Sequence, residues 1–142
     1  MKYIKIKTLE KGWHDKDEVF LHAAFQILTD FIEQEKPVTI VDWNADELHK
    51  RAWKEIKSLY KWWKEIRPSR KSPLDDKNLI VPPLKFKKIH GSNLSKMVKP
   101  DKKKYAEYYQ ALEKHCKLEI KWNGKDQKNL HRLIEVRGFL WT

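Results

Sequence analysis

The stretch VDWNADELHKRAWKEIKSLYKWWKEIRPSR, residues 41–70, decides the fold, because it carries the start signals, the stop signal and the apolar stripe of one long helix. Asp42 or Asn44 can cap the start of a helix with a side-chain oxygen, and Pro68 cannot continue one. We therefore predict a helix over residues 45–66. This predicted helix contains three of the seven tryptophans of the chain.

One side of this helix has the spacing of a core-facing stripe. At 100° per residue, six apolar side chains fall on it, and we expect that side to be buried. The flanks carry polar and aromatic side chains and are where a functional site could form, and an exposed Trp62 would fit a homodimer. The stripe consists of Leu48, Ala52, Ile56, Leu59, Trp63 and Ile66, and the flanks of His49, Trp53, Tyr60, Arg67, Glu55 and Trp62.

The segments before this helix predict a strand and a second helix. Residues 1–9 alternate isoleucines with lysines, which is the pattern of a short, half-exposed strand. Asp15 lies three residues ahead of Glu18, as in a capping box, and residues 18–35 carry a broad apolar face typical of a central helix packed on two sides. Residues 38–41 are β-prone and predict a short strand or an extended connection.

The segments after it are less regular. Four prolines and one glycine make residues 69–100 a long basic loop, within which residues 84–89 alternate like an edge strand. A third helix from Asp101 should end before the turn signal Asn123-Gly124. A last helix should cover residues 126–136, and the apolar tail that follows should cover the core.

These elements predict a mainly α protein, a single-domain bundle of about four helices with a small β element from the N-terminal strand and the central loop. A chain of 142 residues is long enough to bury a core as one domain, residues 1–142. The single cysteine, Cys116, excludes an intrachain disulfide and fits a reducing compartment, and its helical spacing predicts a buried side chain. Because no window approaches the length of a membrane span, we expect a cytoplasmic protein.

Charge is unevenly distributed along a chain whose formal net charge is +11. Between residues 15 and 35, six acidic residues face one lysine, whereas between residues 85 and 104 eight lysines face Asp101 alone. A second basic stretch covers residues 50–71. An excess of this kind predicts an anionic partner, and the simpler alternative is solubility.

Arg67 and Arg70 flank Pro68 at the predicted helix end, where planar guanidinium groups could grip a phosphate or a carboxylate. With histidines and aromatic side chains from the helix flanks, they predict a pocket for a phosphorylated or nucleotide-like ligand. The candidate ligand-binding residues are Arg67, Arg70, His49, Trp53, Tyr60, His22, His131 and Arg137.

The lysines of residues 85–104 predict a different contact, with nucleic acid or with an acidic protein. Lysines interleaved with aromatic side chains could hold phosphates while the rings stack on bases. For the basic face of the helix over residues 45–66, an ordinary solvated surface is the alternative explanation. The candidate contact residues of the loop are Lys85, Lys87, Lys88, Lys102, Lys103 and Lys104.

Histidine and carboxylate pairs allow a metal site as an alternative. Glu18 with His22, Asp42 with His49, and His131 with Glu135 could converge if three helices faced one another. No HExxH motif, nucleophile motif or glycine-rich phosphate loop occurs, so no catalytic residue and no cofactor are assigned, and hydrogen-bonded histidines explain the pairs as well. The alternative ligand set for a divalent metal is Glu18, His22, His49, Glu55 and His131.

Three segments carry a resemblance: WHDKDEVFLHAAFQILTDFIEQE, the stretch quoted first, and LHRLIEVRGFLWT. In order, spacing and the LWT ending they resemble a group of small proteins of unknown function encoded by tailed bacteriophages. The resemblance leaves out the loop over residues 69–100 and the third helix. It implies a phage accessory protein in the bacterial cytoplasm, but no activity. The residues shared with the pattern are Trp13, Glu18, His22, Asp42, Trp43, His49, Glu55, Trp63, Arg67, Arg70, His131 and Arg137.

Three hypotheses about function follow. The leading one is a non-enzymatic phage protein that binds a phosphorylated, nucleotide-like ligand or nucleic acid, and so counters a host defence. The second is a metal-dependent hydrolase, and the third is an inhibitor that docks on an acidic host protein through the basic loop. Binding that weakens steeply with salt would indicate nucleic acid over a closed pocket.

Overall fold

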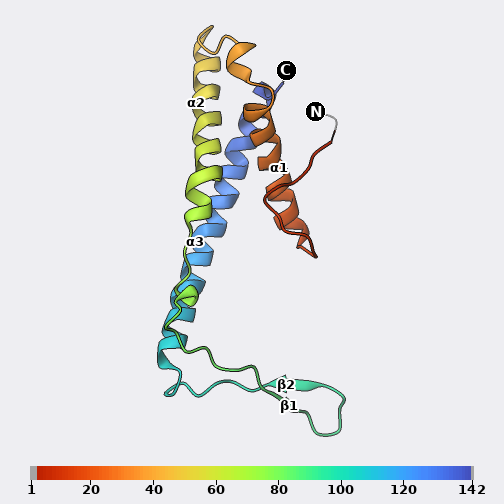
Figure 1. The fold of residues 1–142 in the computed structure, drawn as a ribbon, viewed down its shortest axis with the longest axis vertical. Helices are drawn as coiled ribbons and strands as arrows, with labels where there is room; N and C mark the ends of the chain where they lie inside the picture. The colour runs from red at the N-terminus through yellow and green to blue at the C-terminus, as the bar shows by residue number, and fades with distance from the viewer. Residues whose placement is uncertain (1–2, 142) are drawn as a thin grey trace. The chain divides into compact units, whose positions relative to one another are not determined.

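The computed structural model describes residues 3–141 of the chain. Within that range the protein is mainly helical, with three α-helices and one two-stranded antiparallel sheet, which confirms the predicted fold class (Figure 1). No helix in it is long and apolar enough to cross a membrane. The elements are α1 (Lys16–Glu33), α2 (Glu47–Lys61), α3 (Ala106–Val136), β1 (Phe86–Lys88) and β2 (Ser95–Met97).

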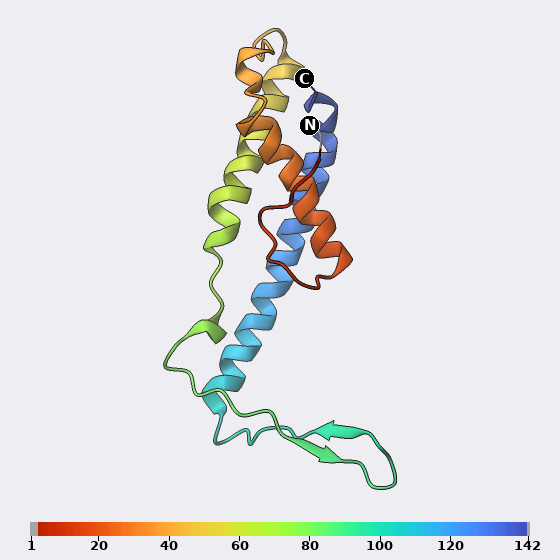
Figure 2. The same ribbon diagram turned by 45° about the vertical axis from the view of Figure 1, so that its right-hand side comes forward.

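Two compact units divide the chain. The first comprises Met1–Arg70 together with Asn123–Thr142, and the second comprises Lys71–Trp122. Helices α1 and α2 and the C-terminal part of α3 belong to the first unit, where they lie side by side (Figure 2). Strands β1 and β2 belong to the second unit.

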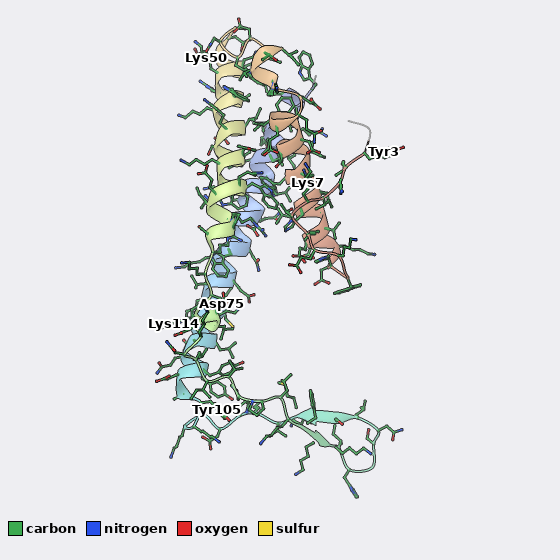
Figure 3. All side chains as sticks on the ribbon, in the orientation of Figure 1. Tyr3, Lys7, Lys50, Asp75, Tyr105 and Lys114 are labelled. Atoms are coloured by element: carbon green, nitrogen blue, oxygen red, sulfur yellow. The ribbon has the colours of Figure 1, made fainter. Side chains whose placement is uncertain are left out.

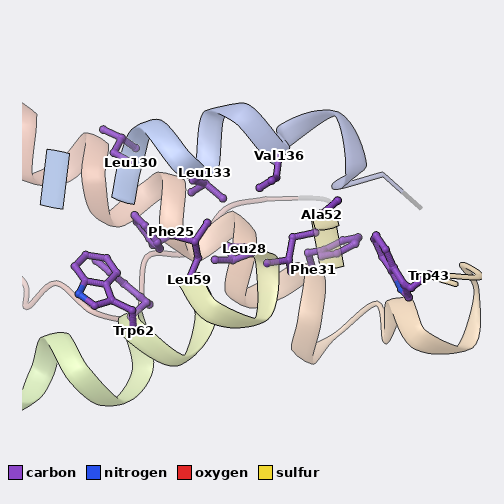
Figure 4. Packing of buried hydrophobic residues seen from close by; sticks show 12 residues of the cluster. Phe25, Leu28, Phe31, Trp43, Ala52, Leu59, Trp62, Leu130, Leu133 and Val136 are labelled. Atoms are coloured by element: carbon purple, nitrogen blue, oxygen red, sulfur yellow. The ribbon is translucent and has the colours of Figure 1, made fainter. Parts of the chain in front are cut away.

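The core of the first unit is built from one face of each helix. Helix α1 contributes Phe25, Leu28 and Phe31, and helix α3 contributes Leu130, Leu133 and Val136 (Figure 4). Helix α2 adds Ala52, Ile56 and Leu59, and the turn after it adds two tryptophans. Burial of these large side chains is the main favourable term in the folding of this unit.

Helix α1 differs from its prediction in width and length. It ends at Glu33 instead of residue 35, and the side chain of Asp15 makes no cap hydrogen bond. Phe25 and Leu28 are fully buried, but Phe20 is 60% exposed. The first turns of α1 therefore extend beyond the core, and the helix is not packed on two sides along its whole length.

Helix α2 begins two residues later than predicted, because its N-cap is Asp46 and not Asp42 or Asn44. The carboxylate of Asp46 accepts a hydrogen bond of 2.8 Å from the backbone N–H of His49. Asp42 instead holds the turn before the helix by accepting from the backbone N–H of Asn44. Leu48, in the first turn of α2, lies outside the core and is 67% exposed, contrary to the predicted stripe.

The helical path of α2 continues as a π-helical turn, Trp62–Ile66, and a 3₁₀ turn, Arg67–Ser69. A π turn holds more residues than an α turn, so it shifts the phase of the side chains after it. Trp62 and Trp63 are consequently both buried, at 4% exposure each, while Ile66 is 53% exposed. Trp62, which the sequence places on a flank of the helix, is therefore not the exposed side chain that would have fitted a homodimer.

The predicted strands of the first unit do not form. Residues 38–41 begin inside a 3₁₀ turn, Pro37–Thr39, whose proline carbonyl accepts from the indole of Trp43. Residues 3–9 form no strand and are tied to α1 by a hydrogen bond from the Lys7 backbone to Gln26. Met1 and Lys2, which began the predicted N-terminal strand, lie outside the described residues. The small β element therefore comes from the central loop alone.

The third and fourth predicted helices are one helix. Helix α3 runs for 31 residues through Asn123 and Gly124. The glycines with positive φ in the described range are Gly12 and Gly91, so Gly124 keeps a helical backbone and does not form the predicted turn. Asn and Gly each reduce helix stability by up to about 1 kcal/mol, which is less than the packing of the residues that follow contributes. Cys116, on the exposed part of this helix, is itself exposed and not buried as predicted.

The second unit contains more local order than the prediction of an irregular loop implied. Ser72 caps the 3₁₀ turn Pro73–Asp75 with a capping box, and its hydroxyl lies 2.7 Å from Nδ1 of His115 on α3.

At the C-terminal end of the chain, Phe139 and Leu140 pack against the core of the first unit, but Trp141 is 62% exposed and Thr142 lies outside the described residues. The tail therefore covers the core only in part.

The two ends of the predicted stripe on α2 offer a matched test of this core. Leu59→Ala should lower the free energy of unfolding by about 2–5 kcal/mol, because the leucine is fully buried and its removal leaves a cavity. Leu48→Ala should change it by less than about 0.5 kcal/mol. Urea denaturation of both variants measures the difference, and equal losses would contradict the burial described here.

Candidate functional site

Arg67 and Arg70, predicted to bind a phosphate or a carboxylate, bind a carboxylate of the chain itself. Arg67 donates from Nε and Nη2 to Asp126 on α3 at 3.3 and 3.2 Å, and Arg70 donates from Nη2 and Nη1 at 2.6 and 3.2 Å. The guanidinium groups lie over Trp63 and Trp62, with centroid distances of 4.8 and 5.8 Å. We call these three charged residues the arginine clamp.

His22 lies next to the arginine clamp and is buried, at 5% exposure. Its Nδ1 is 2.6 Å from the hydroxyl of Thr8, and its ring meets the edge of Trp63 at 4.9 Å. Burial lowers the pKa of His22, and the positive charge of Arg67 lowers it further. His22 is therefore a hydrogen-bonded core histidine whose neutral form the fold favours.

The other predicted ligand-binding residues lie elsewhere. Trp53 stacks on Trp43 at 4.8 Å, and Figure 4 shows Trp43 and Trp62 at opposite ends of the core. The ring of His49 lies against Phe139, and its Nδ1 is 2.9 Å from Asp46. Tyr60 donates to Glu33, His131 is exposed beside Gln127, and Arg137 is exposed. The predicted pocket residues are thus divided between separate contacts.

The residues of the alternative metal site are divided as well. Glu18 pairs with His14 at 3.3 Å, and Glu55 pairs with Arg132 at 2.8 Å. From residue 3 to residue 141, no three His, Cys, Asp or Glu side chains form a group that could hold a metal ion. The three predicted pairs are replaced by other contacts: Glu18 pairs with His14, His49 pairs with Asp46, and His131 lies beside Gln127.

Sequence reasoning missed three polar residues of α3, two of which join it to α2 or to the turns that follow α2. Asp126 belongs to the arginine clamp, and Arg132 binds Glu55. Asn129 is fully buried between them and accepts a hydrogen bond of 2.9 Å from Arg132, while its Nδ2 has no partner among the described residues. The spacing of three residues between these polar side chains places them on one face of the helix and could have indicated a polar contact. Spacing alone does not identify Arg67, Arg70 and Glu55 as the partners.

The lysine-rich segment has a different character, because its side chains are exposed. Residues 84–99, which we call the basic hairpin, contain β1, β2 and the turn that joins them, and every one of them is exposed. Lys87 lies directly opposite Lys96, and Phe86 lies opposite Met97. Like charges at opposite positions destabilise a hairpin, so the pair of lysines costs stability.

Three further lysines, Lys102, Lys103 and Lys104, lie in the turn that leads into α3. The carboxylate of Asp101 accepts from the backbone N–H groups of Lys103 and Lys104, and these hydrogen bonds hold the pKa of Asp101 below its ordinary value. The Lys104 ammonium lies 5.5 Å from the ring of Tyr105. Positive side chains are unfavourable at a helix N-terminus, so these lysines also add charge at some cost in stability.

Removal of the shared carboxylate tests the arginine clamp. Asp126→Asn should lower the free energy of unfolding by about 2–3 kcal/mol, because two partly buried guanidinium groups lose their charged acceptor. Lys50→Gln, which removes an exposed pair with Glu47, should change it by less than about 0.5 kcal/mol. Urea denaturation measures both, and a neutral Asp126→Asn would show that the clamp does not stabilise the fold.

His22 predicts a pH dependence of stability. Its pKa in the folded protein lies below the ordinary value of 6.5. Between these two pKa values the unfolded chain binds more protons than the folded protein does, so stability rises with pH there. This contribution is present above pH 6.5 and is lost as pH falls through the folded pKa. His22→Gln should therefore lose part of the slope of unfolding free energy against pH below 6.5, whereas His131→Gln, at an exposed position, should keep it. Identical slopes would refute the assignment.

No protein-family model, no curated protein and no solved structure matches this chain. Its function must therefore be inferred from its own contacts and charges. The arginine clamp already has its anion in Asp126, whereas the lysines of the basic hairpin project into solvent. The surface formed by the basic hairpin and Lys102, Lys103 and Lys104 is accordingly the better candidate for a functional site.

Proposed function

We propose that this protein binds nucleic acid through the basic hairpin and the three lysines at the start of α3. The observation that carries the proposal is the charge of residues 85–104, where eight lysines are all exposed and the acidic residue is Asp101. Within residues 3–141, no salt bridge pairs any of these lysines with a carboxylate. Clustered, unneutralised ammonium groups bind phosphates and release the counterions of a nucleic acid.

Two lysines of the helical run that begins with α2 are paired with carboxylates of the chain, unlike the lysines of residues 85–104. Lys50 pairs with Glu47 at 3.0 Å, and Lys64, in the π turn that follows, pairs with Glu33 at 2.9 Å. In the basic hairpin, Lys87 faces Lys96 instead of an acidic residue. A charge arrangement that opposes folding but suits an anion favours binding over solubility as its explanation.

Apolar side chains support the same proposal. Phe86 is 64% exposed and Met97 is 52% exposed, and they lie opposite each other between lysines. An isolated two-stranded hairpin is only marginally stable in water, and exposed apolar side chains on it gain by contact with a partner. Aromatic rings next to lysines are typical of surfaces that contact bases while they hold phosphates.

The alternatives have less support from the geometry. A pocket for a small phosphorylated ligand would need Arg67 and Arg70, which are bound to Asp126. A metal-dependent hydrolase would need His22, His49 and His131 to meet at one site. Each of these histidines instead contacts a different partner, namely Thr8, Asp46 and Gln127. The resemblance to phage proteins supports a setting in the cytoplasm of an infected bacterium, where phage and host nucleic acids are both present.

Charge removal in the basic hairpin tests the proposal. The triple variant Lys85→Gln, Lys87→Gln, Lys88→Gln should bind a fluorescent DNA duplex more weakly. The slope of log affinity against log salt concentration should also fall by roughly 3, because about 0.9 counterions are released per phosphate contact. Fluorescence anisotropy titrations between about 50 and 200 mM salt measure both quantities.

The matched control removes the same charge from α2. Lys54→Gln, Lys57→Gln, Lys61→Gln takes away three exposed lysines of the solvated face and should leave the salt slope close to that of the unmodified protein. If the two triple variants lose the same affinity, binding is due to net charge alone. If the unmodified protein binds no nucleic acid at low salt, the proposal is wrong, and an acidic protein becomes the better partner.

A further inference from the structure

We propose that the nucleic acid is B-form double-stranded DNA and that the basic hairpin lies in its major groove. This inference rests on the proposed function and adds the class of ligand and the way it is bound.

Lysines point from both faces of the ribbon formed by β1 and β2. Because successive side chains of a strand point to opposite faces, Lys87 and its partner Lys96 lie on one face and Lys88 lies on the other. The pairing of the two strands extends to Lys85, whose carbonyl oxygen accepts a 2.7 Å hydrogen bond from the backbone N–H of Val98. Lys85 lies two residues before Lys87 and therefore shares its face. The positive charge of the ribbon is therefore two-sided.

Both faces are open to a ligand. Residues 84–99 are all exposed, and Figure 3 shows side chains projecting from the two sides of the β1 and β2 ribbon. A single strand that lay on one face would leave the lysines of the other face without phosphates. Two phosphate backbones, one along each face, would satisfy all of them.

Groove dimensions select the duplex. The major groove of B-form DNA is about 12 Å wide and admits a two-stranded β-ribbon, with a phosphate backbone on either side. The major groove of A-form RNA is deep and too narrow for side chains to read. Phe86 and Met97 share the face of Lys88, so they would face the same wall of the DNA groove as that lysine.

The test compares ligands of one sequence with the full-length protein. Anisotropy titrations should give the tightest binding for duplex DNA, with single-stranded DNA and duplex RNA weaker by about tenfold or more. A DNA duplex whose pyrimidines carry bulky C5 substituents, which project into the major groove, should also bind about tenfold more weakly. Equal or tighter binding of duplex RNA or single strands, or no effect of the C5 groups, would overturn the groove assignment while leaving nucleic-acid binding intact.

Two single variants test the two-sided contact. Lys87→Gln and Lys88→Gln remove one charge from opposite faces, and each should weaken duplex binding and lower the salt slope by about 1. Lys114→Gln, an exposed lysine on α3, should leave both quantities unchanged. If one of the hairpin variants matches the Lys114 control, contact is one-sided and the inference fails. If no nucleic acid binds at all, the proposed function fails with it.

Discussion

The carboxylate of Asp126 is the contact on which the arrangement of this protein depends. It accepts hydrogen bonds from Arg67 and Arg70, which follow α2, and so joins the end of that helical run to α3. Beneath the two guanidinium groups lie Trp63 and Trp62, which close one end of the core. Because the second unit is inserted in the sequence between Arg70 and Asn123, the chain leaves and re-enters the first unit at this clamp.

The separation of roles follows from that clamp. Arginines that satisfy an internal carboxylate contribute to stability, since they are shielded from water by tryptophan rings and by α3. The lysines of residues 85–104 are exposed and form no salt bridge with any carboxylate of the described residues. Two groups of basic residues can therefore be distinguished: the half-buried arginines of the clamp, which are paired with a carboxylate, and the exposed lysines of residues 85–104, which are not.

Much of the fold could be predicted from sequence, because apolar periodicity and helix signals are local. Residues 18–35 and 45–66 were identified as helices from those signals, and the observed helices agree within a few residues apart from the π turn. The turn signal at Asn123-Gly124 failed, since packing of the following residues outweighs a local preference. Of the candidate site, the lysine cluster was visible because it is contiguous, whereas the pairing of Arg67 with Asp126, 59 residues away, carries no local signal.

The π-helical turn Trp62–Ile66 has a consequence for insertions and deletions. Such a turn corresponds to an α-helix with one residue added, and the wider turn takes up that residue without changing the direction of the side chains beyond it. The loss of one residue from this segment would convert it to an α turn and leave Arg67 and Arg70 facing Asp126. The turn is therefore a place where the helical run can gain or lose one residue without moving the arginine clamp.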